Sequence, residues 1–222
     1  GIVEGGMPAW EGAGFNVFKG VNVPSKVFGE LVEHACHTPY IDAGTLRMLQ
    51  EGGEPFVILD GRSLEEFERM SIPSAIGCPN AELSLRIDAL SPDPNATVVV
   101  NCAGRTRSII GAQSLIDLGV ERKVVALRNG TMGWRLADFL LDHGSTAVFP
   151  DDLTPEHIGQ AQERGRRLAE RDGIRFIDLP TLERWQADET KTLYVLDVRT
   201  EQEHEAGHPG GAQQDRKSTR LN

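Results

Sequence analysis

The feature that most constrains the fold of this chain is a sequence pattern that occurs more than once. Three blocks recur in order: Gly6 and Trp10 as Gly130 and Trp134, Tyr40–Leu46 as Phe176–Leu182, and Ile58–Glu68 as Val195–Glu205. Their offsets are 124, 136 and 137 positions, and a one-residue insertion accounts for the difference between the last two. Self-similarity of this kind is typical of chains built from repeated units. We therefore expect a piece of a tandem array.

The repeats divide the chain into five expected parts. They are residues 1–37, the C-terminal remnant of a first unit with a connecting helix at Ser25–Cys36; 38–145, a complete unit; 146–173, a helical connector; 174–214, the N-terminal half of a further unit; and 215–222, a tail. The tail reads DRKSTRLN and resembles a translated sequencing adapter. Because it interrupts the repeat, we favour an artefact over a genuine polar C-terminus.

Within the complete unit, short apolar runs alternate with helical patterns. The expected strands are residues 55–60, 74–78, 96–101 and 123–127, and the expected helices are 43–51, 63–70, 80–90, 107–119 and 130–144. Strands that alternate with helices predict an α/β fold, with a parallel sheet and helices on both of its faces. The run at 96–101 is continuous and β-branched, which favours a central strand.

The residues with chemical potential follow this central strand. Cys102 comes directly after it, and a polar loop then leads into a helix: Ala103, Gly104, Arg105, Thr106 and Arg107. Ligand sites of open α/β sheets lie at the carboxyl ends of strands, and helix N-termini attract anions. A cysteine in this setting is expected to be more thiolate. We expect Gly104 to let the loop curl, so that its N–H groups form a cradle for an anionic sulfur.

These residues resemble the rhodanese family of sulfurtransferases. Rhodaneses have a six-residue active loop that begins with cysteine, and Cys102 to Arg107 has this length. Further family-like motifs are Asp60, Arg62, Glu66 and Phe67 in LDGRSLEEF, IPSA at Ile72–Ala75, and the closing NGTMGW. Ser71 stands where the family often has histidine, and no departure touches the loop. The array resembles the multi-repeat rhodaneses of bacteria.

The resemblance implies a double displacement through Cys102, with Ala103 to Arg107 binding substrate. The thiolate would take the outer sulfur of an anionic donor such as thiosulfate, and a persulfide would pass it to cyanide or a thiol. No cofactor or metal is implied. Arg105 and Arg107 would orient the donor, or one of them would brace the loop against Asp60 or Glu66. The sequence leaves this choice open.

Two other functions compete with sulfur transfer. Phosphatases of the related cell-cycle type need an arginine at the sixth position after the cysteine, and Ser108 stands there. The shorter loop favours one sulfur atom over a phosphate group. A non-catalytic scaffold or sulfur-carrier module is the second alternative, because tandem arrays often mix active and inactive units. The cysteine of the complete unit argues for activity.

Composition narrows the partners. Lys and Arg number 23 and Asp and Glu 33, which gives a net charge of −10. This balance argues against a nucleic-acid partner, and no apolar run approaches the roughly 18 residues of a membrane span. The three cysteines form no CxxC pair, which favours a reducing, cytoplasmic compartment over a disulfide framework. We expect structural roles for Cys36 and Cys78.

Overall fold

The computed structural model describes residues 4–14, 23–199 and 201–214. The tail at 215–222 that we assign to an artefact lies outside the described residues. The elements in chain order are α1 (Gly6–Gly12), α2 (Val23–Cys36), β1 (Tyr40–Ile41), α3 (Ala43–Gly52), β2 (Phe56–Asp60), α4 (Leu64–Arg69), β3 (Ala75–Gly77), α5 (Asn80–Leu90), β4 (Thr97–Asn101), α6 (Thr106–Asp117), β5 (Val124–Leu127), α7 (Gly130–Leu136), α8 (Pro155–Arg171), α9 (Leu179–Gln186), β6 (Leu196–Asp197), α10 (Glu201–Ala206) and β7 (Gln213–Gln214).

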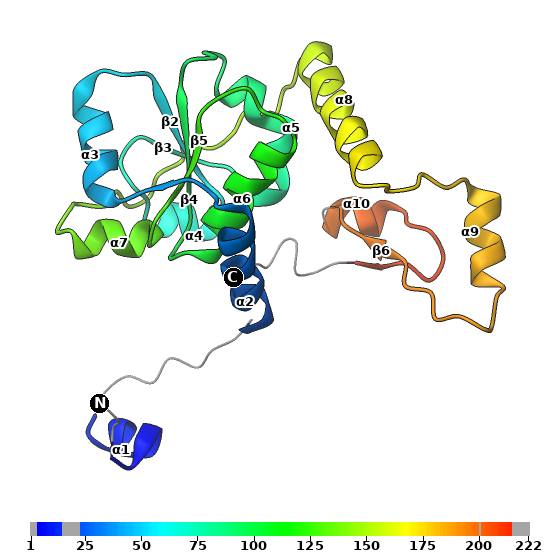
Figure 1. The fold of residues 1–222 in the computed structure, drawn as a ribbon, viewed down its shortest axis with the longest axis horizontal. Coiled ribbons are helices and arrows are strands. Elements are labelled where there is room, and N and C mark those ends of the chain that lie inside the picture. Colours follow the sequence, from blue (N-terminus) through cyan, green and yellow to red (C-terminus); the bar gives the residue numbers. More distant parts are fainter. Residues whose placement is uncertain (1–3, 15–22, 200, 215–222) are drawn as a thin grey trace.

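A parallel sheet of five strands organises residues 40–127, in the order β1-β5-β4-β2-β3. β4 lies at its centre and is buried along its whole length. Helices α5 and α6 cover one face, and α3, α4 and α7 cover the other (Figure 1). The expected α/β class, with a parallel sheet between two helical layers, is confirmed.

The alternation of side chains along each strand builds one apolar core on each face of the sheet. In β4, Val98 and Val100 belong to the core beneath α5 and α6. Val99 between them belongs to the core beneath α3 and α7, which also holds Trp134. Because β2 and β4 pair in parallel as far as Asp60 and Asn101, their polar last residues meet at one edge of the sheet.

Most expected elements of this unit are present to within one or two residues, because their boundary signals are local. Asp42 caps α3 by accepting a hydrogen bond from the N–H of Thr45 at 2.8 Å. Gly53 ends the same helix with φ 76°. The short strand β1 was not predicted, because two residues are too few to show a periodic pattern.

The closing helix is shorter than the sequence predicts. A helix was expected over 130–144, but α7 ends at Leu136. Asp138 has φ 61°, a left-handed conformation that a helix cannot continue through. Trp134 is 1% exposed. Its indole N–H donates to the C=O of Leu140 at 2.8 Å, so its polar atom is hydrogen-bonded even though the side chain is buried. Burying this side chain favours the turn over a longer helix.

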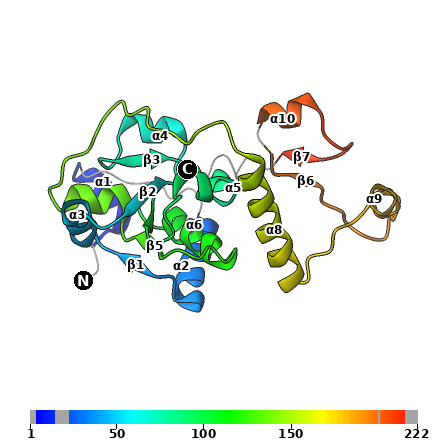
Figure 2. The same ribbon diagram turned by 90° about the horizontal axis from the view of Figure 1, so that it is seen from above.

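Two further helices pack against the helices that cover the sheet. α2 lies against α6, and α8 lies against α5 (Figures 1 and 2). Asp88 of α5 forms ion pairs with Arg164 of α8 and with Arg122. Among the helices of the described residues, none is both long and apolar enough to cross a bilayer.

The described residues near the C-terminus repeat one strand pairing of the sheet. β6 and β7 are parallel, and their register equals that of β2 and β3 after a shift of 137 positions. Leu196 pairs with Gln213 as Leu59 pairs with Ile76. Asp197 pairs with Gln214 as Asp60 pairs with Gly77. Large apolar side chains of this segment are exposed, among them Phe176, Tyr194 and Val198.

The packing of α6 on the sheet gives a first prediction. A Cβ at Gly111 would lie 2.7 Å from Oδ1 of Asn80 and 3.0 Å from Leu83 and Val100. We expect Gly111→Ala to lower the free energy of unfolding by about 1–3 kcal/mol, because a packed core cannot admit an extra methyl group. Urea unfolding followed by circular dichroism measures this.

Gly165→Ala is the matched control, because Gly165 also lies inside a helix and a Cβ there would meet nothing within 4 Å. It should raise the stability of α8 by about 0.5–1 kcal/mol through helix propensity alone. Equal effects of the two substitutions would contradict the packing argument.

Candidate active site at the carboxyl end of β4

Cys102 is the first residue after β4, and α6 begins at Thr106. The residue is only 2% exposed, so its thiol is largely shielded from bulk solvent. The C=O of Cys102 accepts a hydrogen bond from the N–H of Thr131 at 2.8 Å, and the C=O of Ala103 accepts one from Met132 at 3.0 Å. These two bonds attach the start of the loop to the first turn of α7.

Gly130 allows α7 to approach the loop this closely. It has φ 53°, and a Cβ there would lie 2.2 Å from the carbonyl oxygen of Cys102. Glycine adopts this positive φ without strain and has no Cβ that would clash with the carbonyl oxygen, so only glycine fits at this position. The glycine of the NGTMGW motif therefore has a direct role in the position of the cysteine.

The N–H groups of the loop contrast with its anchored carbonyls. The backbone N–H groups of residues 103–107 form no hydrogen bond with any part of the chain that the structure describes. They precede and include the first turn of α6, where the helix dipole adds partial positive charge. Consecutive free donors at a helix N-terminus favour the binding of an anionic group.

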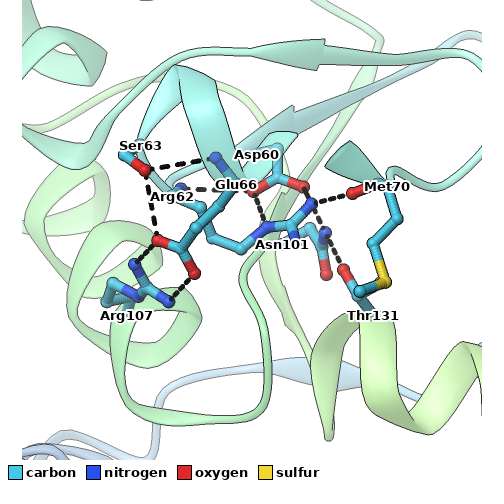
Figure 3. A network of polar contacts seen from close by, with 8 residues as sticks. All are labelled: Asp60, Arg62, Ser63, Glu66, Met70, Asn101, Arg107 and Thr131. Atoms are coloured by element: carbon cyan, nitrogen blue, oxygen red, sulfur yellow. Dashed lines mark hydrogen bonds and ion pairs between the residues drawn. The ribbon is translucent and has the colours of Figure 1, made fainter. Parts of the chain in front are cut away.

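Beneath the loop lies a buried network of polar side chains (Figure 3). Asp60 accepts hydrogen bonds from Nε and Nη2 of Arg62, both at 2.8 Å. Its Oδ2 also accepts one from the amide of Asn101 at 2.7 Å. The same amide donates to the hydroxyl of Thr131 at 3.0 Å, and Arg62 donates to the C=O of Met70 at 2.7 Å. The network joins β2, β4, α7 and the end of α4.

Arg107 braces the loop from the side (Figure 3). Its guanidinium donates to both oxygens of Glu66, at 2.7 Å and 3.0 Å. Burial favours the neutral form of Glu66, but the bonds and charge of Arg107 outweigh it and hold the pKa of this carboxyl below its usual value. Burial likewise opposes the charge of Arg107, yet the bond to Glu66 and the charges of Glu66 and Cys102 raise the pKa of its guanidinium. Of the two bracing partners considered, Glu66 is the one in contact.

Arg105 points to another element. Its guanidinium donates to both oxygens of Glu30 on α2, at 2.7 Å and 3.1 Å, and forms a further ion pair with Glu33. The bond to Glu30 is the main reason that the pKa of Arg105 is raised. The two arginines of the loop therefore have different partners. Arg107 pairs with α4, which covers the sheet, and Arg105 pairs with α2, which packs on α6.

The remaining loop residues are half-buried: Ala103, Gly104 and Thr106. Gly104 does not have a positive φ, so the curl expected at this residue does not use a left-handed glycine conformation. A Cβ at Gly104 would meet nothing within 4 Å, so space is open beside this residue.

Ser108 stands where a related phosphatase would have its phosphate-binding arginine. It is 1% exposed, and its hydroxyl donates to the C=O of Arg105 at 2.7 Å. The side chain at this position therefore closes the first turn of α6 and is not available to a phosphate group.

The other two cysteines lack this setting. Burial raises the pKa of Cys78 to about 12, so this thiol stays protonated and acts as a small apolar side chain. Cys36 is exposed at the end of α2, which does not fit the buried structural role expected for it.

Sequence reasoning missed four residues of the site. Asn101 and Thr131 complete the Asp60 network, and Glu30 and Glu33 hold Arg105. Asn101 had a detectable signal, since an amide directly before Cys102 ends an otherwise apolar strand. The α2 carboxylates had none, because they are more than 70 residues from Arg105 along the chain.

The buried network gives a second prediction. Arg62 and Asp60 have side chains that are 4% and 0% exposed, so Asp60→Asn leaves a buried guanidinium without its counter-charge. We expect the free energy of unfolding to fall by about 3–5 kcal/mol. Glu65→Gln is the control, because Arg69 and Glu65 form a pair that is 68% and 84% exposed. It should change stability by less than about 1 kcal/mol in the same urea titration. Comparable losses in the two variants would contradict the account of the network.

Comparison with known proteins agrees with this geometry. Residues 42–137 match the family model of the rhodanese-like domain. A crystal structure of a thiosulfate sulfurtransferase from Pseudomonas aeruginosa is 47% identical with a TM-score of 0.83, over 97% of this chain and 41% of that one.

Two curated relatives match over shorter stretches. An HTH-type transcriptional regulator of Mycobacterium tuberculosis is 33% identical over 96 residues, which cover 43% of this chain and 41% of that protein. YrkF of Bacillus subtilis, named as a candidate sulfur carrier protein, is 28% identical over 102 residues, which cover 46% of this chain and 54% of that protein. The chain therefore spans about half or less of the length of these three relatives. Residues 42–137 of this chain form a rhodanese-like domain.

Proposed function

We propose that this domain is a sulfurtransferase that carries a sulfane sulfur as a persulfide on Cys102. The observation that carries the proposal is the row of free N–H groups at residues 103–107, directly after a shielded cysteine. A persulfide at neutral pH is an anion one sulfur atom longer than the thiolate. Such an anion would gain the hydrogen bonds and helix-dipole attraction that this loop offers. The similarity to the Pseudomonas aeruginosa thiosulfate sulfurtransferase supports the same reaction class.

In the first half-reaction, the Cys102 thiolate attacks the outer sulfur of a small anionic donor such as thiosulfate. A new sulfur–sulfur bond forms to Cys102, the sulfur–sulfur bond of the donor breaks, and sulfite leaves with the bonding electron pair. In the second half-reaction, cyanide or a thiol attacks the terminal sulfur, and the Cys102 thiolate leaves. With cyanide the product is thiocyanate. No cofactor is needed, because the cysteine both accepts and releases the sulfur.

The residues of the loop would have different parts in this cycle. The N–H groups from Ala103 to Arg107 would bind the negative charge of donor and persulfide. The open space beside Gly104 leaves room for the donor. Arg107, held by Glu66, would act as a fixed positive charge near Cys102 and would position the loop. A reducing compartment, the cytoplasm, suits a cysteine that must return to the thiolate.

The five-part organisation of the chain is also a proposal. The parallel pairing of β6 and β7 in the register of β2 and β3 supports a further rhodanese unit that begins near residue 174. The Asp60 network has a counterpart there, since Asp197 accepts hydrogen bonds from Nε and Nη2 of Arg199 at 2.9 Å and 2.6 Å. At the other end, α1 starts with a left-handed glycine, Gly6, 124 positions before Gly130.

The test is the intact mass of the full chain after incubation with thiosulfate. We expect a gain of one sulfur atom that cyanide removes, and no gain in Cys102→Ser. Cys36→Ser is the matched control, because Cys36 is the exposed cysteine and should not compete for the sulfur. It should gain and lose sulfur as the wild type does.

A folded chain that gains no sulfur, either from thiosulfate or from a thiosulfonate of lower charge, would contradict the proposal and favour the non-catalytic scaffold. A chain that gains sulfur but does not pass it to cyanide or to a thiol would favour a sulfur carrier over an enzyme.

A further inference from the structure

Helix α2 contributes charge to the loop from outside the rhodanese-like domain. The family match begins at residue 42, and α2 ends at Cys36. Even so, α2 packs along α6, whose first turn belongs to the active loop (Figures 1 and 2). The two acidic residues that α2 directs to the loop are Glu30 and Glu33, and both pair with Arg105.

The position of α2 is fixed by close packing as well as by charge. Gly29 is buried, and a Cβ there would lie 2.8 Å from Cγ2 and 3.4 Å from Cα of Thr106. The helix backbone therefore lies directly on a residue of the loop. Thr38, just after α2, donates a hydrogen bond at 2.8 Å to Gln113 of α6. These contacts hold the carboxylates next to Arg105 rather than leaving them on a free helix.

The two arginines of the loop are both paired with carboxylates. Arg107 is matched by Glu66, whereas Arg105 faces two carboxylates. Helix α2 therefore cancels the positive charge that Arg105 would otherwise present to an anionic donor, and the guanidinium of Arg128 lies over the ring of Tyr40 nearby. Arg105 is three residues from Cys102, so their Cα atoms are at most about 11 Å apart. The charge that α2 cancels therefore belongs to the same short loop as the reacting sulfur.

A cleft of about 450 Å³ lies beside this cluster. Its lining includes Glu30, Glu33 and Arg105 together with Tyr40, His34 and His37. A donor that approaches the loop through this cleft passes the carboxylates of Glu30 and Glu33 and the guanidinium of Arg105. The charge of the donor therefore affects how easily it reaches Cys102.

We propose that Glu30 and Glu33 are specificity-determining residues that select sulfur donors of low negative charge over dianions such as thiosulfate. This inference rests on the proposed sulfurtransferase function and adds a donor class to it. The favoured donors are monoanions, namely thiosulfonates and the persulfides of uncharged thiols. With a persulfide RSS⁻, the Cys102 thiolate bonds to the outer sulfur, the sulfur–sulfur bond of RSS⁻ breaks, and RS⁻ leaves with the bonding electron pair. The transferred sulfur keeps its negative charge as the outer sulfur of the Cys102 persulfide.

The test compares two donors that react in the same way and differ by one charge, thiosulfate and methanethiosulfonate. Glu30→Gln and Glu33→Gln are combined in the full chain, because glutamine keeps an oxygen to which Arg105 can donate. We expect the KM to fall roughly tenfold for the dianion and roughly threefold for the monoanion, since the Coulomb energy scales with the charge of the donor. The kcat for each donor should stay within about twofold, because the two carboxylates act on the approach of the donor.

The matched control is Glu163→Gln with Glu170→Gln. These two carboxylates also share one arginine, Arg166, but they lie on α8. The control removes the same total charge, so it should leave both KM values unchanged if the effect is local to the loop.

A second measurement does not depend on sulfur transfer. Cys102 is alkylated with iodoacetate, a monoanion, and with iodoacetamide, which is neutral, and the modified peptide is quantified so that Cys36 and Cys78 do not interfere. The ratio of the iodoacetate rate to the iodoacetamide rate should rise roughly threefold in the α2 double variant and stay constant in the α8 control.

An unchanged alkylation ratio, or equal changes in KM for the two donors, would overturn the inference. A wild type that takes sulfur from neither donor would contradict the proposed function instead. The alkylation ratio would still decide whether α2 sets the charge at Cys102.

Discussion

The ion pair between Asp60 and Arg62 is the interaction on which the site depends. Both side chains are almost completely buried, so each would be costly without the other. Additional hydrogen bonds offset the cost of burying the two charges, because Asp60 also accepts from Asn101 and Arg62 also donates to the C=O of Met70. A charged pair that satisfies most of its hydrogen bonds can fix neighbouring elements in a way that apolar contacts alone cannot.

This network determines where the cysteine lies. Asn101 is the residue before Cys102, and its amide bonds both Asp60 on β2 and Thr131 on α7. The N–H of Thr131 in turn holds the carbonyl of Cys102. Cys102 is thus held by its own carbonyl and by the side chain of the residue before it, while the N–H groups that follow it stay free for an anion. The carbonyl groups of Cys102 and Ala103 anchor the start of the loop, and its N–H groups remain available to bind an anion. The two functions therefore use different backbone groups.

Local signals explain why much of the fold could be predicted from the sequence. Helix caps such as Asp42 and glycine ends such as Gly53 act within a few residues, and the apolar run of β4 is long enough to detect. The length of α7 could not be predicted, because it depends on the burial of Trp134. The partners of Arg105 and Arg107 could not be assigned either. Each partner lies far away in sequence, and only the packing of α2 and α4 brings it close.

The central claim is that the free N–H groups of residues 103–107 hold anionic sulfur at Cys102. The most direct measurement is a ¹⁵N–¹H correlation spectrum of the full chain before and after persulfide formation with thiosulfate. The account predicts that the largest amide shifts fall on residues 103–107, that cyanide reverses them, and that Cys102→Ser shows none. A persulfide detected by mass while these five amides keep their original shifts would contradict it.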